Sequence, residues 1–275
     1  MNQTHQLMMS ATPIPRSLAM SFFGDLDVSV IDELPPGRKP IQTSCLPLSG
    51  KEKLIERIFA ATKKGSKVYW ICPLIEESEN LDLNAVMETY EDLSEYFGSS
   101  NVGCLHGKLS AKEKQNQIQA FKDSKTSILV STTVVEVGVD IPDADIMVIE
   151  NAERFGLAQL HQLRGRIGRG NKESFCILMH KDKIQDISME RLQALVDSQD
   201  GFKIAEKDLE IRGPGEIMGA QQTGIVPMKY TNLVRDSQYL METKKVAELI
   251  CNEEPELANQ LIERWISGSI AFADA

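Results

Sequence analysis

The stretch Val130–Pro142, which reads VSTTVVEVGVDIP, decides the fold and is followed by a second stretch, Gln159–Gly170, which reads QLHQLRGRIGRG. The first stretch runs from apolar residues into small hydroxyl residues and then a Gly-x-Asp corner. The second carries two arginines three positions apart, each preceded by glycine. In open α/β sheets, ligands bind at the carboxyl ends of strands, where such a corner would lie. Together the two stretches predict a surface for a ribose and a triphosphate.

A regular alternation of helix and strand patterns surrounds these stretches from about residue 51 onward. Several strand patterns are apolar on both faces, as parallel strands are when helices cover both sides of their sheet. The helix patterns occupy residues 51–64, 82–97, 110–121, 157–164 and 184–197. The strand patterns occupy residues 67–72, 101–105, 127–131, 145–149 and 174–179. We therefore expect an α/β fold with a parallel sheet between two layers of helices.

The two ends of the chain depart from this alternation. Residues 28–31 form a further candidate strand, which the Pro-Pro-Gly at 35–37 would end. Residues 200–224 mix glycines, charges and amides, which fits either a helical hairpin punctuated by glycines or an ordinary surface loop. Residues 232–266 read as two helices broken near Pro255. A helical C-terminal extension is therefore expected after the sheet.

The composition is that of an ordinary globular protein, with 42% hydrophobic and 25% charged residues. No apolar run reaches the length of a membrane span, and the N-terminus lacks the layout of a signal peptide. The five cysteines are scattered without a Cys-x-x-Cys pair. This spacing indicates reduced core thiols rather than a disulfide framework or a zinc site, so no metal site is expected.

The formal net charge of −10 argues against a protein that coats nucleic acid by bulk attraction. The charge is unevenly distributed along the sequence, since residues 154–172 contain five basic residues and no acidic one. Between Lys67 and Lys108 there are eight acidic residues and no basic one. A polyanion is therefore expected to approach one face of the molecule.

Arg166 and Arg169 are the strongest candidates for chemistry. Phosphoryl transfer needs positive charge where negative charge builds on the γ-phosphate, and an arginine from a neighbouring domain supplies it. The planar guanidinium group also matches phosphate oxygens better than an ammonium group does. The alternative is a solvated charge patch, and for residues 131–140 an ordinary connection between strands. Arginines at this spacing between glycines are rarer than a charge patch, which favours the phosphate reading.

Two other segments partly resemble nucleotide-binding motifs. Asp32–Glu33 could pass for a magnesium-binding pair, but no phosphate loop precedes it. His106–Ser110 resembles the end of a phosphate loop, but Val102 stands where the first glycine belongs and Leu109 where Ser or Thr belongs. Neither is expected to be catalytic. The turn at His106 is instead expected to contact a backbone phosphate of a nucleic acid.

Several segments resemble the helicases of superfamily 2: residues 10–16 resemble motif III, residues 131–140 motif V and residues 162–169 motif VI. Segments 30–38, 157–166 and 208–216 extend the resemblance to the RecG family of bacterial DNA helicases over nearly the whole chain. The related Mfd-like translocases share the motor and the hairpin, whereas the helix with Trp265 and the length of the tail fit the RecG family better.

The resemblance implies three regions: residues 1–25 are the end of a first motor domain and a linker, residues 26–185 are a second, RecA-like motor domain, and residues 186–275 are a translocation hairpin and C-terminal helices. A wedge domain, a phosphate loop and a magnesium box are expected to precede residue 1 in the parent protein. ATP with Mg²⁺ would therefore be a cofactor of the full-length parent. The chain by itself is expected to bind no cofactor and to lack ATPase activity.

The resemblance also assigns roles to individual residues. Gly138 and Asp140 would line the nucleotide cleft, Arg166 and Arg169 would act as arginine fingers, and Gln162 would lie near the γ-phosphate. The residues that would couple nucleotide state to DNA movement are Ser10, Thr12, His106, Thr132, Arg191, Arg212 and Gln222.

The function implied by the resemblance is ATP-driven remodelling of stalled replication forks and Holliday junctions in recombination and repair. The expected partners are branched duplex DNA and the first motor and wedge domains of the same polypeptide, with no membrane. The expected location is the bacterial cytoplasm near the nucleoid. Three alternatives stay open: a non-catalytic module that binds DNA or a protein partner, the equivalent region of an Mfd-like translocase, and one half of an RNA helicase.

Overall fold

The computed structural model describes residues 39–73, 79–132, 144–168, 172–212 and 239–266, and the isolated positions 7, 9, 29, 31 and 236. The chain falls into two compact units. Unit 1 comprises residues 1–12 and 32–204, and unit 2 comprises residues 13–31 and 205–275. Unit 1 thus extends past residue 185, where the motor domain was expected to end.

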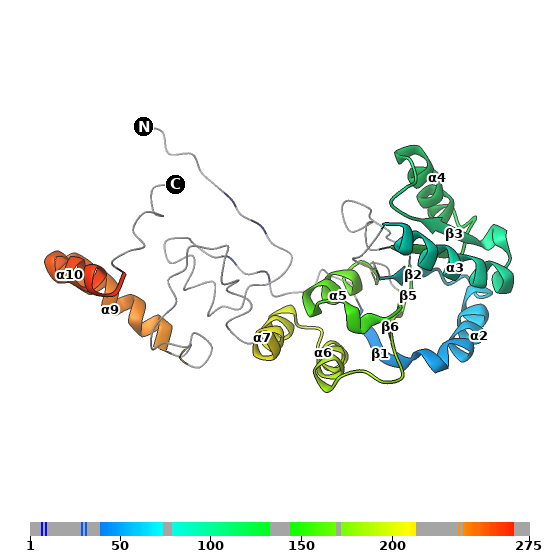
Figure 1. The fold of residues 1–275 in the computed structure, drawn as a ribbon. Helices are drawn as coiled ribbons and strands as arrows, with labels where there is room; N and C mark the ends of the chain where they lie inside the picture. Colours follow the sequence, from blue (N-terminus) through cyan, green and yellow to red (C-terminus); the bar gives the residue numbers. More distant parts are fainter. Residues whose placement is uncertain are drawn as a thin grey trace. The chain divides into compact units, whose positions relative to one another are not determined.

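Unit 1 is built on a six-stranded sheet with the strand order β1-β6-β5-β2-β4-β3 (Figure 1). Every pairing in this sheet is parallel, which confirms the expected architecture. The strands are β1 (Ile41–Pro47), β2 (Val68–Cys72), β3 (Val102–Leu105), β4 (Ile128–Thr132), β5 (Ile146–Ile149) and β6 (Ser174–His180). Because all strands point the same way, their carboxyl ends share one edge of the sheet and their amino ends share the other.

Helices cover both faces of this sheet, as the sequence predicts. The described α-helices are α2 (Lys51–Thr62), α3 (Glu79–Phe97), α4 (Ala111–Lys122), α5 (Leu157–Arg164), α6 (Asp186–Asp197), α7 (Gly201–Arg212), α9 (Leu240–Glu253) and α10 (Pro255–Ile266). The described 3-10 helices are η1 (Leu48–Gly50), η2 (Ser99–Asn101) and η4 (Ala152–Arg154). In unit 1 the boundaries agree with the expected ones to within about three residues.

The core has two parts, one on each face of the sheet. On one face, residues of α2 and α3, among them Ile58 and Leu93, pack around Trp70 of β2. On the other face, residues of α4, α5 and α6, among them Phe121 and Leu160, pack on β4 and β5. All residues of β2 and of β4 are buried, since both strands lie inside the sheet under both layers. Each large apolar side chain buried in this way contributes about 1.5–3 kcal/mol.

Helix α4 begins where the sequence places its cap. The Ser110 hydroxyl accepts a hydrogen bond from the Glu113 backbone N–H, and the Glu113 carboxylate accepts one from the Ser110 backbone N–H. This reciprocal pair satisfies two donors that the first helical turn leaves free. The Ser110 hydroxyl also donates to the Glu113 carboxylate at 2.7 Å, and this bond, followed by the one from the Ser110 backbone N–H, holds the pKa of Glu113 below its ordinary value.

Strand β1 is absent from the expected set of strands. Its sequence, IQTSCLP, is polar in the middle and ends in proline, so neither apolar alternation nor an apolar run marks it. As an edge strand it pairs on one side only, with β6, and edge strands tolerate polar residues and proline. Of the candidate strand at residues 28–31, residues 28 and 30 lie outside the described residues, and Ser29 and Ile31 are in neither a helix nor a strand.

The cysteines agree in part with the expectation of reduced core thiols. All five are free; Cys72 and Cys176 are buried, Cys45 and Cys104 are half-buried, and Cys251 is exposed. Burial raises the pKa of both Cys72 and Cys176 to about 12, so neither is a ready nucleophile. The prediction that all five cysteines are core residues is wrong for Cys251, which lies on a helix surface in unit 2.

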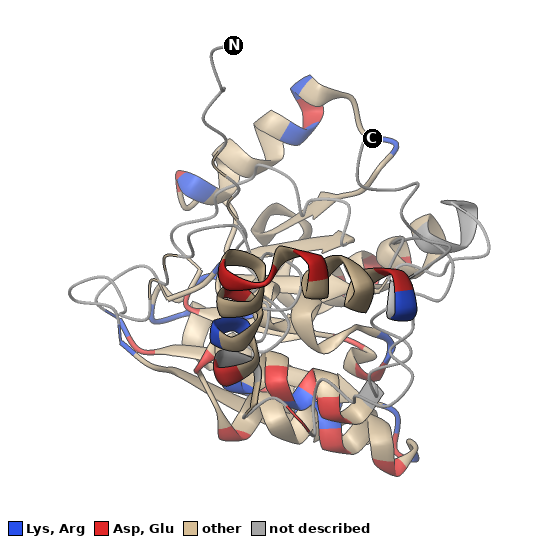
Figure 2. Cartoon of the chain, turned by 90° about the vertical axis from the view of Figure 1, so that its left-hand side faces the viewer, with Lys and Arg blue, Asp and Glu red and all other residues tan. Residues whose placement is uncertain are grey.

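Helix α7 begins in unit 1 and ends in unit 2, and α9 and α10 lie in unit 2 and contact each other. The break between them lies at Glu254, and Pro255 opens α10, where its missing N–H has no helical partner to lose. This confirms the two helices expected at the C-terminal end. Acidic and basic residues are both present along the described helices (Figure 2). No helix among the described residues is long and apolar enough to cross a membrane.

Candidate functional site

The last residue of α5 and the four residues that follow it, Arg164–Gly168, form a tight segment that we call the arginine turn. Its backbone continues the helical pattern, since the N–H of Arg166 donates to the Leu163 carbonyl at 3.0 Å and the N–H of Ile167 donates to the Arg164 carbonyl at 3.3 Å. Ile167 is fully buried in the core on this face. Arg166 is half-exposed and Gln162 is exposed. The turn thus holds Arg166 at the surface between buried neighbours.

Gly168 closes the arginine turn against the sheet. Its φ of +72° lies in the left-handed region that favours glycine. A Cβ at this position would meet Ile41 Cγ1 at 3.1 Å and Ser174 Cβ at 3.4 Å. Ile41 and Ser174 are the first residues of β1 and β6, so the arginine turn ends at the amino edge of the sheet.

Replacing Gly168 by alanine is expected to destabilise unit 1 by more than the about 1–2 kcal/mol that left-handed backbone costs an L-residue. The excess comes from the contact with Ile41. Gly65→Ala is the matched control, because Gly65 has a φ of +86° but nothing within 4 Å of the added Cβ. Denaturant unfolding of both variants measures the difference. Equal losses of stability would show that the contact with Ile41 relaxes without cost.

The expectation that both stretches lie at the carboxyl ends of strands is wrong for the arginine turn, which ends at the amino edge, whereas the first stretch starts at the carboxyl end of β4. Residues that follow the two stretches in the sequence are in contact at the amino edge. Lys172 Nζ lies 3.5 Å from Asp145 Oδ2, and the Phe175 N–H donates to the Asp145 carbonyl at 2.8 Å. Lys172 follows Arg169 closely in the sequence, and Asp145 follows Asp140 closely. Gly138, Asp140 and Arg169 themselves lie outside the described residues, as do Ser10, Thr12, Gln222 and the side chain of Arg212.

His106 and Thr132 lie at the opposite, carboxyl edge, where the neighbouring strands β3 and β4 end. The hydroxyl oxygen of Thr132 and Nδ1 of His106 are buried and have no hydrogen-bond partner among the described residues. Burial, followed by the charge of Lys114, lowers the pKa of His106, so the imidazole is neutral at neutral pH. The predicted DNA-coupling residues of β3 and β4 therefore share one edge of the sheet, and the arginine turn lies at the other.

The turn after β3 also carries positive charge. Lys114 Nζ of α4 donates to the Gly107 carbonyl at 3.1 Å, and Lys108 is exposed in the same turn. Gly107 has no atom within 4 Å of an added Cβ, so the backbone is open there. This combination of cations and accessible backbone suits a phosphate oxygen.

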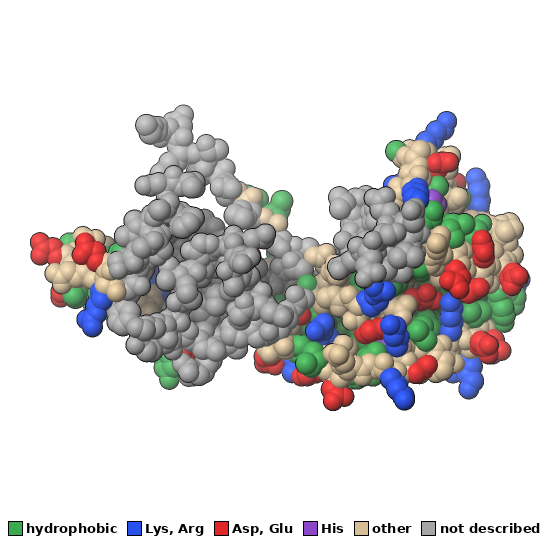
Figure 3. Space-filling view, in the orientation of Figure 1, with side chains coloured by type: hydrophobic (Ala, Val, Ile, Leu, Met, Phe, Trp, Pro, Cys, Tyr) green, Lys and Arg blue, Asp and Glu red, His purple; other side chains and the backbone are tan. Residues whose placement is uncertain are grey.

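On the one face of unit 1 that Figure 3 shows, the charge separation expected from the sequence is not visible, because basic and acidic side chains are interspersed there. The acidic helix α3 lies beside α2, which carries three basic and two acidic residues; Phe59 of α2 contacts Tyr96 and Phe97 of α3. The Lys51–Asp92 ion pair at 3.8 Å joins the two helices. A run of one charge along the chain is thus balanced by a neighbouring helix.

Arg191 lies on α6 in unit 1. Its Nε atom is buried and has no hydrogen-bond partner among the described residues. Arg212 is the last residue of α7. The structure therefore places the backbone of both arginines on successive helices, whereas the predicted partner Gln222 falls outside the described residues.

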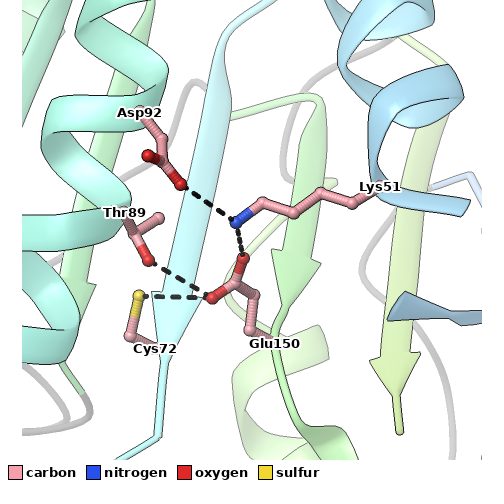
Figure 4. Close-up of polar contacts among 5 residues, drawn as sticks. All are labelled: Lys51, Cys72, Thr89, Asp92 and Glu150. Carbon is pink, nitrogen blue, oxygen red and sulfur yellow. Dashed lines mark hydrogen bonds and ion pairs between the residues drawn. The ribbon is translucent and has the colours of Figure 1, made fainter. Parts of the chain in front are cut away.

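A buried polar network at the carboxyl end of β5 was not expected from the sequence. Glu150 is 7% exposed, and its carboxylate forms an ion pair with Lys51 at 2.8 Å (Figure 4). The Thr89 hydroxyl donates to the same carboxylate at 3.3 Å, and the Cys72 thiol lies 4.0 Å from it. Each of these residues is on a different element, so the network ties α2, α3, β2 and β5 together. The one sequence signal was a charged residue directly after a buried strand.

Two family models match the chain. Residues 50–171 match the helicase conserved C-terminal domain, and residues 198–264 match the C-terminal part of domain 3 of the ATP-dependent DNA helicase RecG. The first match contains β2 to β5 and the arginine turn but not β1 or β6, and the second begins directly after α6.

Known proteins resemble the chain over nearly its whole length. The ATP-dependent DNA helicase RecG of Pasteurella multocida is 51% identical over 96% of the chain, and that of Escherichia coli K12 is 49% identical over 98%. The chain spans only 38% and 39% of the length of these two relatives.

A solved structure of RecG bound to a three-way DNA junction is 47% identical, covers 84% of this chain and 30% of that one, and superposes with a TM-score of 0.65. Sequence and fold agree over both matched regions. The chain therefore belongs to the RecG family, of which it carries the helicase C-terminal domain and the C-terminal part of domain 3.

Proposed function

We propose that the chain is the C-terminal motor half of an ATP-dependent DNA helicase that remodels branched DNA, such as stalled forks and Holliday junctions. The observation that carries the proposal is the arginine turn, which holds Arg166 at the surface beside the amino edge of a parallel sheet. Its relatives are named ATP-dependent DNA helicases, and one was solved on a three-way junction. In this function the chain works with a first motor domain and a wedge domain of the same polypeptide.

The amino edge is the nucleotide side in this proposal. Arg166 and Arg169 reach the γ-phosphate of an ATP held by the first motor domain, and Gln162 lies beside them. Gly138 and Asp140 contact the nucleotide from the connection between β4 and β5, which ends at this edge. The arginine turn fits the role because it is rigid, half-exposed and cationic. ATP supplies the free energy of hydrolysis, and we assign its Mg²⁺ to residues of the parent protein outside this chain.

The carboxyl edge is the DNA side. His106 and Thr132 lie there, each with a buried polar atom that has no partner among the described residues, and the exposed Lys108 adds charge beside them. Contacts of this kind bind phosphates without reading sequence and weaken as salt rises. Ser10 and Thr12 couple the nucleotide state to DNA, and the hairpin residues Arg191, Arg212 and Gln222 convert closure of the motor into a step along duplex DNA. Such a protein would act in the bacterial cytoplasm, near the nucleoid.

The experiment that tests this function is steady-state ATP hydrolysis by the full-length parent protein. We expect a three-way DNA junction to stimulate hydrolysis more than linear duplex DNA, and RNA to stimulate it least. Strongest stimulation by RNA would favour an RNA helicase. Binding of the junction without hydrolysis would favour a non-catalytic module. The isolated 275-residue chain is expected to hydrolyse no ATP until a first motor domain is added.

A further inference from the structure

Arg164, the first residue of the arginine turn, is a buried cation with an unusual set of partners. Arg164 is only 3% exposed. Nη1 donates to the backbone carbonyls of Leu195 at 2.7 Å and Ser198 at 2.9 Å. Nη2 lies 3.2 Å from Nδ1 of His161, which must accept because a guanidinium group has no acceptor. No functional role for Arg164 was expected from the sequence.

The carbonyls that Arg164 binds belong to the last turn of α6 and its cap. Helix C-termini leave carbonyl groups without helical partners and carry partial negative charge. A guanidinium group therefore compensates these carbonyls, and they in turn compensate the cost of burying its charge. Lysine could not do the same, because its ammonium group lacks the fixed planar geometry that serves several acceptors from one position.

Arg166 is thus held between two fixed points. On one side Arg164 is anchored to α6, and on the other Ile167 is buried and Gly168 rests on the start of β1. The backbone between them is hydrogen-bonded, so the Cα of Arg166 has little freedom. Loss of the anchor at Arg164 would allow the turn to shift without unfolding the core around it.

We propose that Arg164 is a positioning residue that fixes the arginine turn, and so aims Arg166 at the γ-phosphate. This inference rests on the proposed function, since it presumes that Arg166 acts on ATP. Arg164 itself does not touch the nucleotide. Misplacement of a catalytic group by about 1 Å costs about 100-fold in rate, so an anchor of this kind controls kcat rather than nucleotide affinity.

Asp182 offers a control away from the arginine turn. Its carboxylate accepts from the Ser49 N–H at 3.3 Å and from the Ser49 hydroxyl at 2.6 Å. These two bonds fasten the segment after β6 to η1, and they involve neither the arginine turn nor Ile41, against which Gly168 packs. Asp182→Ala therefore removes hydrogen bonds from unit 1 and leaves both fixed points of the arginine turn in place.

The test compares Arg164→Lys with Asp182→Ala in the full-length parent protein on a three-way DNA junction. Arg164→Lys is expected to lower kcat about 10- to 100-fold, with KM for ATP within about twofold. ADP should bind normally, while ADP with fluoroaluminate, a transition-state analogue, should bind more weakly by the same factor as kcat falls. Asp182→Ala is expected to lower the thermal midpoint slightly without changing kcat. A kcat for Arg164→Lys equal to that of Asp182→Ala overturns the proposal.

Two further variants keep the result decisive. If Arg164→Lys does not fold, His161→Ala removes only the third partner and is expected to lower kcat and fluoroaluminate affinity together, by a smaller factor. Unchanged fluoroaluminate affinity in that variant contradicts the positioning role. Arg166→Ala separates the proposed function from the positioning role of Arg164. Normal turnover in Arg166→Ala refutes the role of Arg166 as an arginine finger. An inactive Arg166→Ala together with a fully active Arg164→Lys refutes only the positioning role.

Discussion

Arg169→Ala in the full-length parent protein is expected to lower kcat for ATP hydrolysis by about 1,000-fold or more, while nucleotide binding is largely retained. The reason is that an arginine finger stabilises charge that develops on the γ-phosphate in the transition state and contributes little to the bound ground state. Arg166→Ala is expected to behave in the same way. Single-turnover hydrolysis and nucleotide binding measured on the same preparation separate the two effects.

Arg154→Ala is the control for this experiment, because Arg154 is an exposed arginine of η4 outside the arginine turn. It should leave kcat within about twofold, as surface substitutions away from a site usually have small effects. Normal turnover in both Arg166→Ala and Arg169→Ala would remove the finger role. A loss of nucleotide binding that matches the loss of kcat would instead assign these arginines to ground-state binding.

Lys51→Met is expected to destabilise unit 1 by about 3 kcal/mol, which is the lower end of the range for breaking a buried ion pair. The side chain of Lys51 is 26% exposed and that of Glu150 is 10% exposed, so the substitution leaves a carboxylate in a largely dry site. The lower end applies because water can reach Lys51. Denaturant unfolding of the chain measures the change.

Two further variants test the cause of that loss. Asp92→Asn removes the exposed partner of Lys51, at 3.8 Å, and should cost less than about 1 kcal/mol, as surface ion pairs do. Adding Glu150→Gln to Lys51→Met removes the stranded charge but keeps an acceptor for Thr89, so stability should largely return. No recovery in the double variant would mean that packing of the Lys51 stem over Trp70, rather than the carboxylate, explains the loss.

Local signals in the sequence predicted most of unit 1 correctly. Ser110 and Glu113 form a cap that is complete within one helical turn, so the start of α4 could be read without knowledge of the fold. Strand β2 is buried on both faces and therefore appears as an unbroken apolar run. In both cases the residues that determine the structure are neighbours in the chain.

Long-range features were not predictable in the same way. Strand β1 pairs with β6, which lies far along the chain, and the polar sequence of β1 shows no alternation of apolar and polar residues. The partners of Glu150 come from three other elements, and a lone glutamate after a strand does not specify them. Arg164 resembled its neighbours Arg166 and Arg169 in type, and only the fold shows that its partners are the carbonyls of α6.

The parallel sheet has a mechanical consequence for a protein of this kind. The arginine turn lies at the amino edge beside β1 and β6, and the basic turn after β3 lies at the carboxyl edge on the far side of the sheet. Five residues of β4 at about 3.3 Å per residue, combined at a right angle with the four strand spacings of about 4.8 Å from β6 to β3, give a separation of roughly 25 Å. In the proposed function, a stiff body of this length would act as a lever: a small tilt produced where phosphate is cleaved would sweep the far end along the DNA, without any side chain in between having to rearrange.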